Sequence, residues 1–209
     1  MNKPVIILGA GRIGQAALDI FVSNGVIIYC FLDDDESLHG TEINDISVLG
    51  SMDDDKLLSE LGQKAEAFIA TDENKLRASI VEMLEDLKVM PINAIHDTAQ
   101  ISKNAHIGNG NFIDAGAIIN SGAKISNHTL LMSGCIIDHD AHVGDYAQVG
   151  IGSMIGADVD IGRSTFIGSG VTIVPGVTIG KNTRLGAGSV VIESIKDNAT
   201  VFGNPATIV

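Results

Sequence analysis

One histidine in the chain stands beside carboxylates in a way that suits proton transfer. His139 is followed by Asp140 within the segment Ile137–His142, which reads Ile-Asp-His-Asp-Ala-His. A neighbouring anion favours the protonated imidazole and makes the ring a better proton acceptor. A positioned general base contributes roughly 10²–10⁴-fold to a rate. His139 and Asp140 are therefore the catalytic candidates. His139 would accept a proton, and Asp140 would orient the imidazole and favour its charged form.

A second chemical signal lies near the N-terminus, where residues 9–14 read Gly-Ala-Gly-Arg-Ile-Gly, a complete G-x-G-x-x-G. An apolar run precedes it and a helical pattern follows, which is the context of a dinucleotide-binding fingerprint. Such a loop binds phosphate through exposed N–H groups and the helix dipole, and it does not specify which phosphate. Asp33 and Asp34 follow about 20 residues later, where NAD-binding proteins keep a ribose-binding acid.

Residues 1–93 alternate strand and helix signals and predict the fold that holds this loop. Short apolar runs indicate strands, and apolar positions at i, i+3 and i+4 indicate helices. The predicted strands are 5–8, 26–32 and 67–70, and the predicted helices are 12–23, 51–61 and 74–88. This order gives an α/β half-Rossmann domain, β-α-β-α-β, with a parallel sheet.

Residues 94–209 follow a different pattern, with a period of six. From Ile95 to Val191, 17 successive positions spaced by six are all Ile, Leu or Val. Many of these are followed directly by glycine, and the residue four positions later is usually small. A period of six is typical of a β-helix solenoid, with the aliphatic residue inside and small residues in tight turns. In this register His139 and Asp140 fall at a coil corner and face outward.

The repeat resembles the left-handed parallel β-helix of the hexapeptide-repeat acyltransferases. Its combination with a half-Rossmann domain is similar to the bacterial sugar acyltransferases of the sialic acid O-acetyltransferase family. That family includes the nucleotide-sugar N-acetyltransferases for 4-amino sugars. Shared motifs in this chain are "FLDDD", "ISVLGSMDD", "FIATDENKLR", "HDAHVGD" and "VFGNPA". The resemblance implies coils of three hexads, a homotrimer with active sites between subunits, and a cytoplasmic enzyme of polysaccharide biosynthesis.

The resemblance also implies roles for individual residues. A histidine followed by an acid is the proton acceptor of the family, which matches His139 and Asp140. Coenzyme A contacts map to Gln148, Ser169 and Ala187, and the last two are 18 residues apart and should stack on one corner. Nucleotide-sugar contacts map to Gly11, Arg12, Ile13, Asp33, Asp34 and Asp72. The chain departs from relatives at Gln148, where one branch has histidine, and in the loop, where many read G-A-S-G-H-G.

The expected function is therefore an acetyl-CoA-dependent N-acetyltransferase acting on a UDP- or GDP-linked 4-amino sugar. Acetyl-CoA is the co-substrate, the amine attacks the thioester directly, and backbone N–H groups stabilise the oxyanion. A dinucleotide site usually needs two mononucleotide halves, and this chain has one, which suits a single nucleotide. Residues 1–93 would bind the nucleotide sugar, and residues 94–209 would carry the acyltransferase chemistry.

Three alternatives remain open. The first is O-acetylation of a sugar hydroxyl, such as that of sialic acid, for which the same base would serve. The second is an NAD(P)-binding oxidoreductase or sensor that uses the solenoid only to trimerise and has no use for His139. The third is a non-catalytic scaffold that binds nucleotide sugars and releases no coenzyme A with any acceptor.

Metal and thiol chemistry are not expected. Hexapeptide-repeat carbonic anhydrases bind zinc through three histidines, and His106, His139 and His142 would be the candidates here. Their spacing does not resemble that family. Cys135 occupies the small inward position of its hexad, which predicts core packing rather than an acyl-carrying thiol.

Composition bounds the remaining partners. The chain of 209 residues has 26 Asp and Glu against 13 Lys and Arg, a net charge of −13. This charge argues against nucleic acid or an anionic membrane as the main partner. The longest apolar runs are too short to span a bilayer, so no membrane insertion is expected. Two cysteines and the lack of a signal-peptide pattern predict a cytoplasmic protein.

Overall fold

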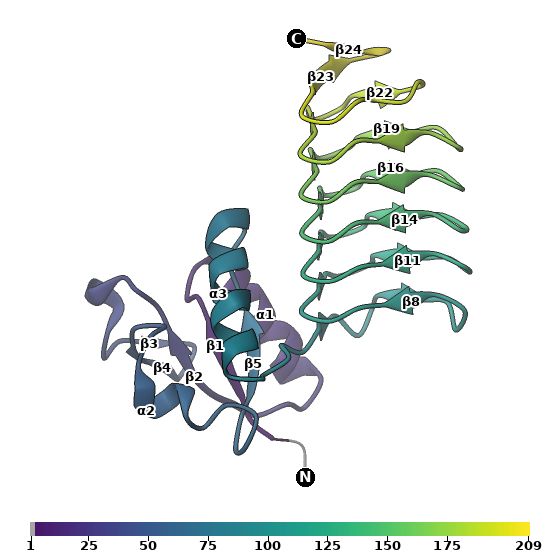
Figure 1. Ribbon diagram of the computed structural model, residues 1–209. Coiled ribbons are helices and arrows are strands. Elements are labelled where there is room, and N and C mark those ends of the chain that lie inside the picture. The colour runs from purple at the N-terminus through teal and green to yellow at the C-terminus, as the bar shows by residue number, and fades with distance from the viewer. Residues whose placement is uncertain (1–2) are drawn as a thin grey trace. The chain divides into compact units, whose positions relative to one another are not determined.

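The computed structural model describes residues 3–209 and divides into two compact units (Figure 1). The first unit ends at Asp97 and the second spans Thr98–Val209. Among the described residues, no helix is long and apolar enough to cross a membrane.

The first unit is built on one sheet with the strand order β3-β4-β2-β1-β5. The strands are β1 (Val5–Leu8), β2 (Ile28–Leu32), β3 (Glu42–Ile43), β4 (Ile46–Gly50) and β5 (Glu66–Ile69). β1 pairs in parallel with β2 and β5, and β2 pairs in parallel with β4. The helices are α1 (Arg12–Ser23), the 3₁₀ turn η1 (Glu36–Leu38), α2 (Asp55–Leu58) and α3 (Asn74–Asp86). The predicted half-Rossmann unit is confirmed, and the antiparallel β3–β4 hairpin extends it beyond the prediction.

The core of this unit explains why these segments fold as they do. All four residues of β1 are buried, as expected for a central strand of a parallel sheet covered on both faces. α1 buries one face, which includes Ile13, Ala17 and Phe21. The Phe21 ring meets the Phe68 ring of β5 edge to face, with 5.4 Å between the ring centroids. The helix predicted over residues 51–61 is reduced to the single turn of α2.

The second unit is a parallel β-helix made of very short strands, whose stacked coils are visible in Figure 1. In chain order, the strands are β6 (Ala94–Ile95), which precedes the boundary, β7 (Gln100–Ile101), β8 (His106–Ile107), β9 (Phe112–Ile113), β10 (Ile118–Ile119), β11 (Lys124–Ile125), β12 (Leu130–Leu131), β13 (Ile136–Ile137), β14 (His142–Val143), β15 (Gln148–Val149), β16 (Met154–Ile155), β17 (Asp160–Ile161), β18 (Phe166–Ile167), β19 (Thr172–Ile173), β20 (Thr178–Ile179), β21 (Arg184–Leu185), β22 (Val190–Val191), β23 (Thr200–Gly203) and β24 (Ala206–Ile208).

Three sheets form the sides of this β-helix. The first has the order β22-β19-β16-β13-β10-β7, and the second has the order β20-β17-β14-β11-β8. The third contains β9, β12, β15, β18, β21, β23 and β24, in that order. Paired residues are 18 apart, as in Ile119–Ile137 and Ile137–Ile155. One coil is therefore three hexads long, as predicted.

Burial follows the hexad pattern. Every aliphatic hexad position from Ile113 to Val191 is buried, while Ile95, Ile101 and Ile107, in the first coil, are half-buried. The third residue after each aliphatic position, from Gly110 to Gly188, has a positive φ in every hexad. The glycines directly after the aliphatic positions serve another purpose. A Cβ on Gly162 would lie 2.5 Å from the backbone nitrogen of Lys181, so these glycines permit close stacking of the coils.

Candidate active site and nucleotide cavity

The glycine loop opens onto a cavity of about 470 Å³ in the first unit. This volume is within the usual range for small-molecule sites. The cavity lies at the carboxyl ends of β1, β2 and β5, where open α/β sheets bind their ligands. Its lining includes all six residues that the family resemblance assigned to the nucleotide sugar: Gly11, Arg12, Ile13, Asp33, Asp34 and Asp72.

The three motif glycines do different things in this loop. Gly9 has a φ of +115°, and a Cβ there would lie 2.5 Å from the carbonyl oxygen of Ala70. A Cβ on Gly14 would lie 2.1 Å from the carbonyl oxygen of Gly9. Gly11 is the N-cap of α1, and a Cβ there meets nothing within 4 Å. Gly9 and Gly14 are therefore needed for packing, and Gly11 faces open space at the positive end of the helix.

The two acids after β2 are held differently. The Asp33 carboxylate accepts hydrogen bonds from the backbone nitrogens of Ala10 (2.7 Å) and Asp35 (2.9 Å), so it ties the glycine loop to the end of β2. Asp34 accepts one hydrogen bond through Oδ1, from the backbone nitrogen of Met52 at 2.9 Å. Within residues 3–209, no group hydrogen bonds to Oδ2 of Asp34. Asp34 is therefore better placed than Asp33 to receive a ligand hydroxyl.

Sequence analysis missed a residue that supports the far rim of this cavity. Arg77 of α3 is fully buried, and its guanidinium donates to the carbonyl oxygen of Thr71 at 2.8 Å and to the Asn74 side chain. Thr71 and Asp72 line the cavity, so Arg77 holds the backbone from which they project. The sequence did hold a signal for this residue, because an arginine on the apolar face of a helix is unusual and indicates a specific buried role.

His139 lies in the second unit at the corner that follows β13. Its side chain is 61% exposed, and its Nδ1 lies 2.6 Å from Oδ1 of Asp138. The same oxygen accepts hydrogen bonds from the backbone nitrogen of His139 (2.8 Å) and from the Asn120 side chain (2.9 Å). These bonds lower the pKa of Asp138 below its ordinary value, the backbone bond from His139 contributing most, then Asn120, then the His139 ring. Asp138 is thus an anion in contact with the imidazole at neutral pH.

Asp140 does not have the geometry that the sequence suggested. It sits at the left-handed turn position, with a φ of +58°, which directs its side chain to the coil below. A Cβ on Gly122 of that coil would lie 2.0 Å from Oδ1 of Asp140. The carboxylate that hydrogen bonds to the His139 ring is that of Asp138, so the orienting contact expected from Asp140 is corrected to the preceding residue.

The three expected coenzyme A contacts lie on another part of the β-helix. Ser169 and Ala187 stack on consecutive coils at the corner before β19 and β22, where the nitrogen of Gly188 donates to the carbonyl oxygen of Ser169 at 2.9 Å. Gln148 lies in β15, on the third sheet. His139 follows β13 and Ser169 precedes β19 of the same sheet, so the two corners flank one face. A single chain brings Ser169 and Ala187 together but separates both from His139.

Other reactive groups are accounted for by packing. Burial raises the pKa of Cys135 to about 12, so its thiol is no nucleophile at neutral pH. Among residues 3–209, no group of three or more His, Cys, Asp or Glu side chains is arranged to hold a metal. His142 bonds through Nδ1 to Asp160 at 2.8 Å and through Nε2 to Ser126 at 3.0 Å.

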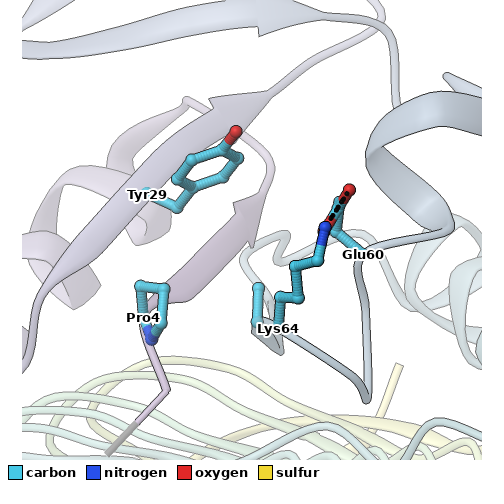
Figure 2. A pocket seen from close by; sticks show the side chains of 5 residues that line it. Pro4, Tyr29, Glu60 and Lys64 are labelled. Carbon is cyan, nitrogen blue, oxygen red and sulfur yellow. Dashed lines mark hydrogen bonds and ion pairs between the residues drawn. The ribbon is translucent and has the colours of Figure 1, made fainter.

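A second pocket, of about 190 Å³, lies at the opposite, amino edge of the sheet in the first unit. Figure 2 shows Pro4 and Tyr29 on one side of it, and Glu60 and Lys64 on the other. The Lys64 ammonium lies 2.8 Å from the Glu60 carboxylate, which raises the pKa of Lys64. None of the residues assigned a role from the sequence lines this pocket.

Comparisons with known proteins agree with both units. Residues 4–84 match the PglD N-terminal domain, and residues 140–173 and 158–193 match the bacterial transferase hexapeptide (six repeats). No curated protein sequence matches the chain.

Solved structures cover the whole chain. PerB from Caulobacter crescentus, in complex with CoA and GDP-perosamine, is 28% identical, with a TM-score of 0.91 over 100% of this chain and 98% of that chain. The acetyltransferase domain of PglB from Neisseria gonorrhoeae FA1090, in complex with acetyl coenzyme A, is 26% identical, with a TM-score of 0.92 over 100% of both chains. WeeI from Acinetobacter baumannii AYE shares the fold at 23% identity, with a TM-score of 0.82 over 100% of both chains.

The glycine-loop unit and the hexapeptide repeats thus occur together, over their full length, in acetyltransferases of known structure. The chain therefore joins a PglD N-terminal domain to the hexapeptide repeats of the bacterial transferases, and its full-length matches identify it as a hexapeptide-repeat acyltransferase.

Proposed function

We propose that this protein transfers the acetyl group of acetyl-CoA to the amine of a UDP- or GDP-linked 4-amino sugar. One observation carries the proposal. The six residues expected to hold the nucleotide sugar line one cavity of about 470 Å³, in a chain that matches the PerB complex with CoA and GDP-perosamine over its full length. Two further structures of that relative carry asparagine or alanine in place of one histidine.

The division of labour follows the two halves of the chain. Residues 1–93 bind the nucleotide sugar, with the N–H groups at the start of α1 and Arg12 facing the phosphates, and with Asp34 and Asp72 facing the nucleoside. Residues 94–209 carry the acyl transfer. Asp33 contributes mainly by holding the loop, since both its carboxylate oxygens accept backbone hydrogen bonds.

The chemistry at His139 is direct acyl transfer. The sugar amine attacks the thioester carbonyl, and Nε2 of His139 accepts the proton that the nitrogen loses. Backbone N–H groups stabilise the tetrahedral oxyanion, which collapses to the amide and releases coenzyme A as the leaving thiolate. That thiolate then takes up the proton.

The assembly is a homotrimer whose active sites lie between subunits. In one chain, His139 and the stacked Ser169 and Ala187 flank the sheet of β7 to β22, so the base of one subunit must meet the coenzyme A held by Gln148, Ser169 and Ala187 of another. The outward positions of that sheet support a subunit interface because they are mostly apolar and in register. They are Gln100, Ile118, Ile136, Met154, Thr172 and Val190. Both substrates are cytoplasmic metabolites, so we place the enzyme in the cytoplasm, where its product would feed polysaccharide synthesis.

A thiol-release assay tests the proposal. Acetyl-CoA is mixed with a panel of UDP- and GDP-linked 4-amino sugars and with sialic acid, and His139→Ala is run beside the wild type. We expect release of coenzyme A with one amino sugar and at least a 100-fold loss in the variant. Equal release by wild type and variant would overturn the role of His139. Release with sialic acid alone would establish O-acetylation instead.

The remaining alternatives are separated by binding. If NAD(H) raises the melting temperature and nucleotide sugars do not, the first unit is a dinucleotide site and the proposal fails. If nucleotide sugars bind and no acceptor releases coenzyme A, the protein is a scaffold.

A further inference from the structure

We propose that Asp138, the residue before the histidine, is the positioning residue that fixes the orientation and tautomer of His139, and that Asn120 on the coil below locks Asp138 in place. This inference rests on the proposed role of His139 and goes beyond it, because the chemistry had been assigned to the pair His139–Asp140. Its basis is the hydrogen bonding at one carboxylate oxygen.

Three donors converge on Oδ1 of Asp138. They are the Asn120 side-chain amide at 2.9 Å, the backbone nitrogen of His139 at 2.8 Å and the His139 ring at 2.6 Å. Asn120 lies 18 residues earlier, so it approaches from the neighbouring coil, whereas the other two donors come from the next residue. A carboxylate with donors from two coils has little rotational freedom, and the ring that contacts it is held in one plane.

This contact decides which ring nitrogen carries the proton. An ionised carboxylate only accepts hydrogen bonds, so Nδ1 of His139 must be the donor when the imidazole is neutral. Nε2 is then the unprotonated nitrogen, and it lies on the side of the ring away from Asp138. When Nε2 accepts a proton from the attacking amine, both nitrogens are protonated and the Asp138 charge stabilises the imidazolium. The proton on Nδ1 stays on the ring, as in the Ser-His-Asp arrangement.

The local fold explains why Asp138 holds this position and Asp140 does not. Asp138 directly follows the inward-facing Ile137, and its backbone is fixed by hydrogen bonds to Ile155 (2.9 Å) and Ala141 (3.2 Å). Asp140 has the left-handed turn conformation, and its carboxylate lies over Gly122. The two acids are therefore close in sequence but separated in direction.

The test compares variants at the two acids. Asp138→Ala removes the acceptor, and Asp138→Asn removes only the charge. The matched control is Asp140→Asn, since asparagine tolerates a φ of +58° better than alanine does. The Asp138 side chain is 38% accessible and Asp140 is exposed, so we expect these variants to fold.

The first readout needs no substrate. In full-length protein labelled with ¹⁵N-histidine, the His139 resonances are assigned by their loss in His139→Ala, and their chemical shifts report the tautomer. We expect neutral His139 to carry its proton on Nδ1 in the wild type and in Asp140→Asn. In Asp138→Ala, we expect a shift towards protonation at Nε2. An unchanged tautomer in Asp138→Ala, or an equal change in Asp140→Asn, would overturn the proposal.

The second readout is steady-state kinetics with the acceptor identified above. Loss of the triad aspartate in a buried serine protease site costs about 10⁴-fold. His139 is 61% exposed, so water replaces part of the lost interaction, and we expect kcat to fall about 10- to 100-fold in both Asp138 variants, with KM within about threefold. Asp140→Asn should lose less than about threefold. If no acceptor is turned over, the proposed function fails, while the tautomer measurement still decides the role of Asp138.

Discussion

The glycine loop allows a sharp test, because two of its glycines respond differently to the same change. Gly14→Ala adds a methyl group 2.1 Å from the carbonyl oxygen of Gly9 and 3.4 Å from the Phe31 ring. A carbon and an oxygen need about 3.4 Å, so the loop and helix must separate by more than 1 Å. Overpacking of this kind costs about 1–3 kcal/mol or more. In a unit of this size, each kcal/mol lowers the melting temperature by about 4–8 °C.

Gly11→Ala is the matched change without the clash. The backbone at Gly11 has φ −71° and ψ −165°, which any residue adopts, and an added Cβ meets nothing within 4 Å. Restricting the unfolded chain should leave stability unchanged or raise it by about 0.4–1 kcal/mol. The new methyl group, however, occupies space at the start of α1 where the phosphate is proposed to lie. We expect nucleotide affinity to fall about 10- to 100-fold, which corresponds to about 1.4–2.8 kcal/mol.

Urea denaturation measures the first effect, and isothermal titration calorimetry with GDP, UDP and their sugars measures the second. Our reasoning requires that Gly14→Ala is destabilised and that Gly11→Ala is stable but binds weakly. If Gly11→Ala binds nucleotide as tightly as the wild type, the loop does not hold the phosphate. If Gly14→Ala is as stable as the wild type, the close approach to the carbonyl oxygen of Gly9 does not explain why position 14 is a glycine.

Other predictions concern the β-helix and its charges. Ile161→Ala removes a fully buried hexad side chain and should cost about 2–5 kcal/mol of unfolding free energy in urea; a cost below 1 kcal/mol would contradict the role of the hexad core. Met154 is 49% exposed in a single chain, and Met154→Asp would bury a charge in the proposed subunit interface. We expect light scattering to show monomers in place of the trimer, whereas an intact trimer would exclude this face as the interface. Burial raises the pKa of Cys30 and of Cys135 to about 12, so a thiol reagent at pH 8 should label neither in the native protein and both in denaturant. Folding lowers the pKa of Asp138, so the ionised carboxylate stabilises the folded protein above the ordinary pKa of 3.8, and this stabilisation is lost as the pH falls through the lower, folded pKa. The difference in unfolding free energy between the wild type and Asp138→Asn should therefore shrink on acidification. A difference that does not change with pH would refute this.

The β-helix was predictable because one rule repeats along it. Each hexad needs an aliphatic side chain that points inward. Ile137 and Ile155 therefore support the prediction of a β-helix together, although neither residue would do so alone. The role of the glycines directly after these positions was harder to predict. Their sequence pattern suggested turns with a positive φ, but Gly162 instead allows the next coil to pack closely, and the residues with a positive φ lie two positions later.

The details of the candidate site depend on neighbours that are distant in sequence. Asp138 and Asp140 flank His139 equally in sequence, and only the turn conformation at Asp140 and the amide of Asn120 distinguish them. The role of Asp33 as an anchor for the glycine loop likewise depends on the pairing of β1 with β2. The β3–β4 hairpin was a missed signal, since Asn44 and Asp45 both have positive φ in its two-residue turn and asparagine and aspartate favour such turns.

The C-terminal hairpin has a consequence for the protein in concentrated solution. A stack of parallel strands presents unpaired N–H and C=O groups on its last coil, and a second copy of the same stack could continue it into a fibre. Here β23 follows the parallel ladder, and β24 then runs antiparallel to it, so the third sheet ends on a strand of the opposite direction. An incoming copy finds a hydrogen-bonding pattern that its own first coil does not match. The β23–β24 hairpin thus closes the third sheet with a strand that a second copy cannot extend in parallel, which disfavours end-to-end association on that side of the β-helix.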